Sequence, residues 1–155
     1  MPRPSRQFKL EMPTIPEHSF QKTLAKVLAI EIAPAGKLSK FGALWFAVDH
    51  ADFGGEVPGI RIGRGIISGL PDTFILFLGK CYLIELKAED GVLTETQKAV
   101  IAAARLAGVE VAVASTSEQV LRILDNWQIP RNRRLKFTMP VEVEERQSAG
   151  SPLPL

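Results

Sequence analysis

The chain has 155 residues, 46% of them hydrophobic, which is the ordinary range for one globular domain. Its single cysteine, Cys81, excludes an internal disulfide and fits a reducing compartment, so we expect a cytoplasmic protein. No stretch approaches the roughly 18 apolar residues that span a bilayer, which argues against membrane insertion. The net charge of +2 permits phosphate binding without predicting it, because nucleic-acid affinity depends on how Lys and Arg cluster.

Three segments are expected along the chain. Residues 1–13 contain three prolines and scattered basic residues, which is typical of a flexible arm. Residues 14–129 carry the periodic patterns of a single domain. Residues 130–155 are basic at first and then lack the apolar residues needed for burial, which predicts a disordered tail.

A helix is predicted from near Glu17, just after Pro16, to the breakers Pro34 and Gly36. Residues 43–48 form a short apolar run that predicts a strand. The glycine-rich stretch that follows is expected to be a long loop, and such loops inside compact domains are usually functional or mobile. The helical assignment rests on apolar residues at helical spacing, namely Phe20, Leu24, Val27, Leu28 and Ile32.

The second half of the chain predicts a crossover. Thr94 opens a helix that continues to Leu106 and stops at Gly108. Residues 109–114 are an apolar run of the buried kind, expected to lie parallel to a strand that precedes the helix. A last helix is expected from about Ser117 to Trp127. The predicted fold class is therefore α/β, with a mixed central sheet flanked by helices.

Residues 73–87 contain two apolar runs around Gly79-Lys80, which indicates a tight hairpin. A two-residue turn there places Asp72 opposite Lys87, with Glu85 on the neighbouring diagonal. Opposed side chains share a face of the sheet, as do residues two apart on one strand, so the three polar groups converge. A three-residue loop would instead move Asp72 to the other face.

Two carboxylates about 4 Å apart repel by roughly 4 kcal/mol at an effective dielectric near 20, so Asp72 and Glu85 on one face require a cation. Mg²⁺ uses one or two carboxylates, waters and a substrate phosphate, and Lys87 beside it would orient water or neutralise phosphate charge. In the alternative interpretation, Asp72 caps a turn while Glu85 and Lys87 pair on a solvated face. The apolar strand 81–84 favours the site, although the assumed register sets Phe74 awkwardly beside Glu85.

Residues 63–124 resemble the virus-type replication-repair nuclease (VRR-NUC) family, a branch of the PD-(D/E)XK superfamily. The shared pattern is Gly-x-Pro-Asp, a hairpin, Glu-x-Lys, a glycine loop, a helix-initial Gln and a Gly before a valine-rich strand. The resemblance implies a restriction-endonuclease-like core of order αβββαβ, followed here by a C-terminal helix. The matching residues, in order, are Gly69, Pro71, Asp72, Glu85, Lys87, Gly91, Gln97 and Gly108.

The resemblance implies hydrolysis of DNA phosphodiesters with Mg²⁺, or Mn²⁺ in its place. Asp72, Glu85 and the backbone carbonyl of Leu86 would bind the metal, and Lys87 would be the catalytic lysine. Small stand-alone, phage-type members are similar to Holliday junction resolvases, which implies branched DNA or flaps as substrates, a homodimer, a role in DNA repair and a host-cytoplasm location. Two alternatives stay open: a non-catalytic DNA-binding or scaffold module with this fold, and a restriction-type endonuclease.

Two further residues are candidates for the site by resemblance. Glu17, with Gln21 one turn later, resembles a first-helix metal ligand of the family, and Glu31 is the competing acid. Glu17 could equally stabilise the helix N-terminus. Gln97 is a candidate catalytic residue, but Thr94 and Gln97 also form a capping-box pattern, in which the glutamine reaches back to the cap.

Several basic residues are candidates for DNA contact. Arg61 and Arg64 have glycine neighbours that allow close approach of a phosphate, and Lys37 and Lys40 are expected near the same cleft. His50 is interpreted as a surface loop residue. A solvated charged surface is predicted for the later cluster Arg131, Arg133, Arg134 and Lys136.

Overall fold

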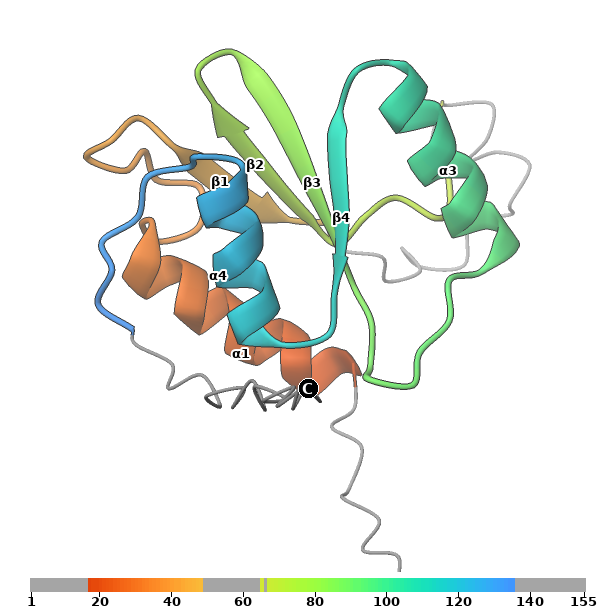
Figure 1. Ribbon diagram of the computed structural model, residues 1–155, viewed down its shortest axis with the longest axis horizontal. Helices are drawn as coiled ribbons and strands as arrows, with labels where there is room; N and C mark the ends of the chain where they lie inside the picture. Colours follow the sequence, from red (N-terminus) through yellow and green to blue (C-terminus); the bar gives the residue numbers. More distant parts are fainter. Residues whose placement is uncertain (1–16, 49–64, 66, 136–155) are drawn as a thin grey trace, which may run out of the picture.

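The structure is a computed structural model that describes residues 17–48, 65 and 67–135. The order of its elements is helix, three strands, helix, strand, helix, as predicted (Figure 1). Within the described ranges, no helix is long and apolar enough to cross a membrane. The elements are α1 (Glu17–Glu31), β1 (Leu44–Ala47), β2 (Thr73–Phe77), β3 (Lys80–Leu86), α3 (Glu95–Leu106), β4 (Glu110–Ala114) and α4 (Ser117–Asn126).

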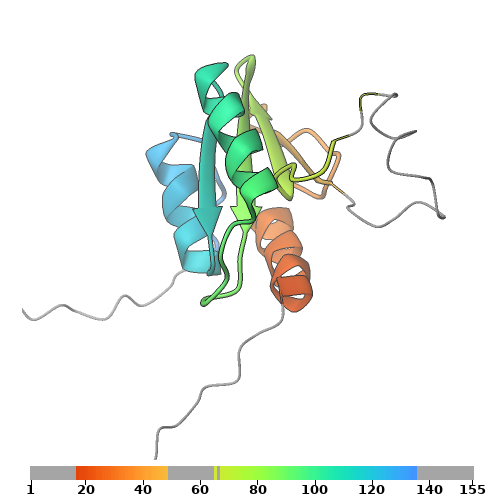
Figure 2. The same ribbon diagram turned by 90° about the vertical axis from the view of Figure 1, so that its right-hand side faces the viewer.

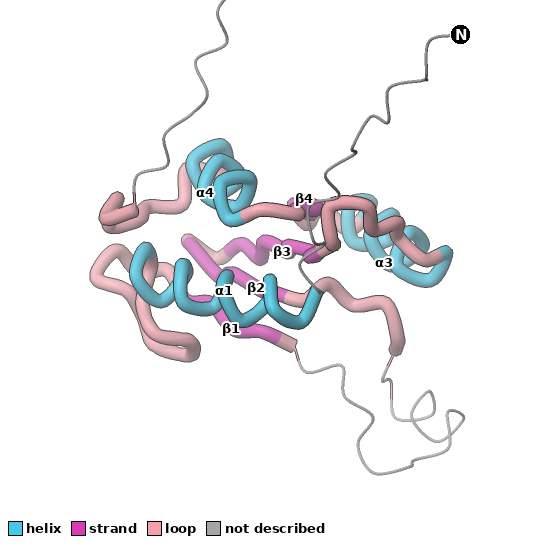
Figure 3. Tube along the Cα trace, turned by 90° about the horizontal axis from the view of Figure 1, so that it is seen from below, coloured by secondary structure: helices cyan, strands magenta, loops and turns pink. Residues whose placement is uncertain are grey.

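The four described strands form one mixed sheet in the order β1-β2-β3-β4 (Figure 3). Strand β2 is antiparallel to both β1 and β3, and β4 is parallel to β3. Helix α3 connects these two parallel strands, as a parallel pair requires a crossover. This confirms the predicted mixed α/β architecture and the predicted strand-helix-strand unit.

Helices cover both faces of the sheet, with α3 nearest the viewer in Figure 2. Helices α1 and α4 pack on one face, because their apolar residues recur at helical spacing and bury against alternate strand residues. Helix α3 packs on the other face through Ile101, which contacts Leu83 of β3 and Val111 of β4. Fully buried members of the larger core are Leu24, Leu28, Ile75, Ile84, Leu86, Val120 and Leu124.

The hairpin turn lies one residue earlier than predicted. Its central residues are Leu78 and Gly79, and the last pair of the ladder is Phe77 with Lys80. Both central residues have positive φ, 49° at Leu78 and 75° at Gly79. Positive φ at both positions is characteristic of a type I′ turn, whose twist matches that of the strands. The predicted turn at Gly79-Lys80 is therefore wrong.

The corrected turn changes every cross-strand partner by two residues and leaves the faces unchanged, because side chains alternate with a period of two. Phe74 pairs with Leu83 instead of lying beside Glu85, so the awkward neighbour disappears. Continued by one pair, the same ladder sets Asp72 opposite Glu85 instead of Lys87. The polar groups therefore still come together after the correction, at the end of the sheet.

Replacing Leu78 by Asn should stabilise the protein. Leu78 is 81% exposed and has positive φ, so it buries little and occupies a conformation that costs an ordinary L-residue about 1–2 kcal/mol. Asn tolerates this conformation, and we expect a gain of about 1 kcal/mol in the free energy of unfolding, measured by urea denaturation. Gly79→Ala should lower stability, since it adds a Cβ at positive φ. Equal stability of Leu78→Asn and the wild type would contradict the turn assignment.

Candidate active site

Asp72, Glu85 and Lys87 come together at the end of β3 that lies away from the hairpin turn. Asp72 precedes β2, Glu85 is the penultimate residue of β3, and Lys87 follows that strand. Their exposed fractions are 5%, 1% and 8%. Lys87 Nζ lies 3.3 Å from Glu85 Oε1. An ion pair on a solvated face is thus excluded, because these charges are buried.

The carboxylate of Asp72 connects β3 to α1. Its Oδ2 accepts a hydrogen bond of 2.8 Å from the backbone N–H of Leu86, and its Oδ1 accepts one of 3.2 Å from Gln21 Nε2. The N–H and C=O of one strand residue point toward the same neighbour, so the Leu86 carbonyl is expected on the Asp72 side of β3. The side chain of Asp72 and the backbone of Leu86 are therefore adjacent.

Glu85 is a buried carboxylate with one oxygen bonded and the other without a partner. Oε1 accepts a hydrogen bond from Gln97 Nε2 and pairs with Lys87, whereas the buried Oε2 has no hydrogen-bond partner. Burial, and then the negative charge of Asp72, raise the pKa of Glu85 to about 7, against the opposing effect of Lys87. An unpartnered buried oxygen is costly, and a bound water or cation would supply the missing partner.

Gln97 is both a helix cap and a contact of the site. The side-chain Oε1 of Gln97 accepts a hydrogen bond of 2.9 Å from the backbone N–H of Thr94. The backbone N–H of Gln97 donates one of 3.2 Å to Thr94 Oγ1, which completes a capping box. The side-chain nitrogen of Gln97, Nε2, donates to Glu85 Oε1. The two interpretations of Gln97 are thus compatible, because the two ends of one amide serve different partners.

Gly69 allows the loop before Asp72 to pack against the start of α3. It has φ of 82°, and a Cβ at this position would lie 3.0 Å from the backbone N of Gln97 and from atoms of Thr96. Any larger residue would push against the helix end that carries Gln97. The glycine of the Gly-x-Pro-Asp pattern therefore has a packing reason.

The first turns of α1 reach the site, as the resemblance implied for Glu17. Glu17 Oε2 lies 3.9 Å from Lys87 Nζ, with the Glu17 side chain 49% exposed. Gln21, one turn later, bonds to Asp72 and was not among the predicted site residues. The sequence feature that points to Gln21 is its spacing from Glu17, since residues four apart lie on the same side of a helix.

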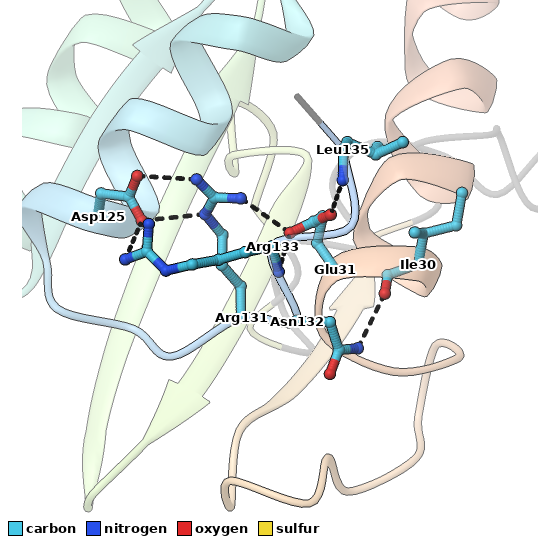
Figure 4. A network of polar contacts seen from close by, with 7 residues as sticks. All are labelled: Ile30, Glu31, Asp125, Arg131, Asn132, Arg133 and Leu135. Carbon is cyan, nitrogen blue, oxygen red and sulfur yellow. Dashed lines mark hydrogen bonds and ion pairs between the residues drawn. The ribbon is translucent and has the colours of Figure 1, made fainter. Parts of the chain in front are cut away.

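Glu31, the competing acid, lies in a different network at the other end of α1 (Figure 4). It is fully buried and accepts hydrogen bonds from the Arg131 guanidinium and from the backbone N–H groups of Arg133 and Leu135, at 2.8, 2.9 and 2.6 Å. Burial acts to raise the pKa of Glu31, but these donors hold it below its ordinary value. Arg131 also binds Asp125 with two bonds of 2.9 Å.

This network corrects the prediction for the later basic cluster. The side chain of Arg131 is only 10% exposed, so a solvated surface is wrong for this residue, whose guanidinium binds two carboxylates. Arg133 and Arg134 are exposed, in agreement with the prediction. Residues 131–135, the basic stretch expected before the disordered tail, are held to α1 and α4 by these bonds.

The lysines predicted to contact DNA lie away from the triad of Asp72, Glu85 and Lys87. Lys37 and Lys40 are exposed in the loop after α1, at the end of the helix opposite Glu17 (Figure 1). A helix of 15 residues is about 22 Å long, so its direction carries this loop away from the site. Lys40 Nζ lies 4.9 Å from the ring centroid of Phe41. Outside the described residues lie the other candidates, Arg61, Arg64, His50 and Lys136.

The donor set at the site suits an ion that is shared with a substrate. Among the described residues, no group of three or more His, Cys, Asp or Glu side chains is arranged to hold a metal ion. Two carboxylates, one with an unpartnered oxygen, and a nearby carbonyl remain. This set fits Mg²⁺, which usually combines one or two carboxylates with waters and substrate phosphates.

Comparisons with protein-family models, with curated proteins and with solved structures gave no significant match to this chain.

Glu85 should make the metal-free protein less stable as the pH rises. The folded state holds a proton on Glu85 up to about pH 7, whereas the unfolded chain releases it near the ordinary value of 4.5. The contribution of Glu85 to the free energy of unfolding is therefore complete below pH 4.5 and is lost as the pH rises through 7. The loss is on the order of 3 kcal/mol.

Urea denaturation in EDTA at several pH values measures this contribution. The difference in stability between the wild type and Glu85→Gln isolates Glu85 from the other titrating groups, and it should grow in favour of the variant up to about pH 7. A difference that does not change with pH would contradict the raised pKa.

Loss of Arg131 should be strongly destabilising. Arg131→Ala leaves the buried Glu31 carboxylate without its cation, and removal of one partner of a buried pair costs about 3–5 kcal/mol. Arg134→Ala is the matched control, because Arg134 is exposed, and it should change the free energy of unfolding by less than about 0.5 kcal/mol. Similar stabilities for the two variants in chemical denaturation would show that the network contributes little.

Proposed function

We propose that this chain is a metal-dependent endonuclease of the VRR-NUC branch of the PD-(D/E)XK superfamily, acting on branched or otherwise structured DNA. The observation that carries the proposal is the buried cluster of Asp72, Glu85 and Lys87, with one oxygen of Glu85 lacking a partner. The order of helices and strands supports the proposed superfamily. The preference for branched DNA and a homodimeric state are inferred from the family resemblance.

Asp72, Glu85 and the Leu86 carbonyl would hold Mg²⁺, with Mn²⁺ able to replace it. When bound, such an ion lowers the pKa of a coordinated water and stabilises the charge that develops on the phosphate. Gln97 donates to Oε1 of Glu85 and so leaves the other oxygen for the metal. Gln21 and the N–H of Leu86 hold the Asp72 carboxylate in one orientation. These contacts position both carboxylates before the substrate arrives.

Lys87 supplies a fixed positive charge next to these carboxylates. Its ammonium group lies 3.3 Å from Glu85 and 3.9 Å from Glu17, so two carboxylates orient it. From this position it would orient the attacking water or offset the negative charge that grows on the scissile phosphate. Because Lys87 is 8% exposed, its interaction with a phosphate is screened less than that of a surface lysine. Burial thus increases the effect of a single lysine.

Asp72→Asn and Lys87→Met should each reduce Mg²⁺-dependent cleavage of a four-way junction or a flap by at least about 10²-fold, a typical loss when one transition-state contact is removed. Both substitutions keep similar volume, and Asn can still accept the bond from Leu86. Initial rates on labelled junctions, flaps and linear duplexes give the measurement, with thermal unfolding to verify the fold.

Matched substitutions on the surface provide the controls. Asp90→Asn and Lys98→Met change the same residue types at exposed positions and should cleave like the wild type. Full activity in Asp72→Asn or Lys87→Met would overturn the proposal. A wild type that binds junctions without cutting them in Mg²⁺ would identify a binding module, and preferential cutting of linear duplexes would identify a restriction-type enzyme.

A further inference from the structure

A pair of stacked aromatic rings lies on the sheet face that carries Glu85. Phe46 of β1 and Phe74 of β2 are direct partners in the antiparallel ladder. Their ring centroids are 5.4 Å apart and their planes differ by 14°. Phe46 is 37% exposed, a large fraction for a phenylalanine within a strand. The stack is therefore open to contact from outside.

The register places this stack next to the carboxylates. Phe74 pairs with Leu83, and direct partners share a face. Glu85 is two residues beyond Leu83 on β3, so it shares the face of Phe74 and Phe46. Asp72, just before β2, lies next to Glu85 at the end of the sheet, where it bonds to Leu86. Two residues along a strand span about 7 Å, a length comparable with one nucleotide of an extended strand. A DNA strand whose phosphate lies at the two carboxylates would thus have a neighbouring base near the two phenylalanine rings.

Helix α3 packs over β3 and β4 on this face, and its contact cluster also includes Phe74 of β2. Its buried residue Ile101 packs on Leu83 and Val111, whereas on the β1–β2 side Phe46 and Leu76 remain 37% and 38% exposed. Strand β1 is at the edge of the described sheet (Figure 3). Phe74 stacks on one side of the Phe46 ring, and the 37% of Phe46 that stays exposed leaves part of its side chain for a further contact.

We propose that Phe46 stacks an unpaired base of the strand whose phosphate lies at Asp72 and Glu85. This inference rests on the proposed endonuclease function and defines its substrate as DNA with unpaired nucleotides beside the cut. Aromatic rings bind single strands by stacking on bases, which is tolerant of sequence because every base has a flat π-face. In a duplex both faces of a base are already stacked, so the exposed ring favours flaps and other DNA with unpaired nucleotides over linear duplexes.

Binding measured without cleavage tests the inference. Fluorescence anisotropy in EDTA would follow a labelled flap with an unpaired arm, and the same flap with abasic sites in that arm. Phe46→Leu keeps an apolar side chain but removes the ring, and it should weaken binding of the intact flap about tenfold. Phe46→Tyr should retain wild-type affinity. Phe41→Leu is the matched control, because Phe41 is 41% exposed but lies in the loop at the far end of α1.

The outcomes separate this inference from the function on which it rests. Wild-type affinity in Phe46→Leu, with a wild type that cleaves flaps in Mg²⁺, would overturn the stacking role and leave the endonuclease proposal intact. Equal weakening of intact and abasic flaps by Phe46→Leu would also overturn it, since the base would then not be the contact. A wild type that neither binds nor cleaves any of these substrates would overturn both.

Discussion

The carboxylate of Asp72 is the contact on which the arrangement of the site depends. One oxygen binds the backbone of β3 at Leu86 and the other binds Gln21 of α1, so a single residue before β2 connects three separate parts of the chain. Gly69, three residues earlier, packs against the start of α3 and brings a fourth part close. Through these contacts the first helix, the hairpin and the crossover helix meet at the end of β3, and Glu85 and Lys87 are enclosed there.

Two buried glutamates of this domain show how the same residue type can serve different purposes. Glu31 has both oxygens bonded, to a guanidinium and to backbone N–H groups, and its pKa is lowered. Glu85 has one oxygen without a partner beside a second carboxylate, and its pKa is raised to about 7. A buried charge whose hydrogen bonds are all made holds segments together. A buried carboxylate with an unpartnered oxygen carries a desolvation penalty that a bound cation would offset. This contrast separates a structural acid from the proposed functional one.

The site also combines a rigid setting with an open side. Glu85 is held by Lys87, which follows β3, and by Gln97 of α3, and the capping box fixes Gln97 itself. Such second contacts keep a functional group in its working geometry. On the face that carries Glu85, Phe46 of β1 stays 37% exposed beside the cluster that α3 forms with β3 and β4. Glu85 and the proposed base platform therefore share one face of the sheet.

Local sequence patterns determined the order of helices and strands, the parallel β3–β4 pair and the proximity of Asp72, Glu85 and Lys87. These features depend on the helical and strand periods, which neighbouring residues carry. The exact hairpin register was not determined, because Leu78 adopts a positive φ that its side chain disfavours. Only the tertiary structure decided which acid of α1 reaches the site, because Glu31 meets Arg131 from 100 residues away and the helix length separates Lys37 from the triad. Contacts between distant segments depend on how whole elements pack, and no local pattern specifies them.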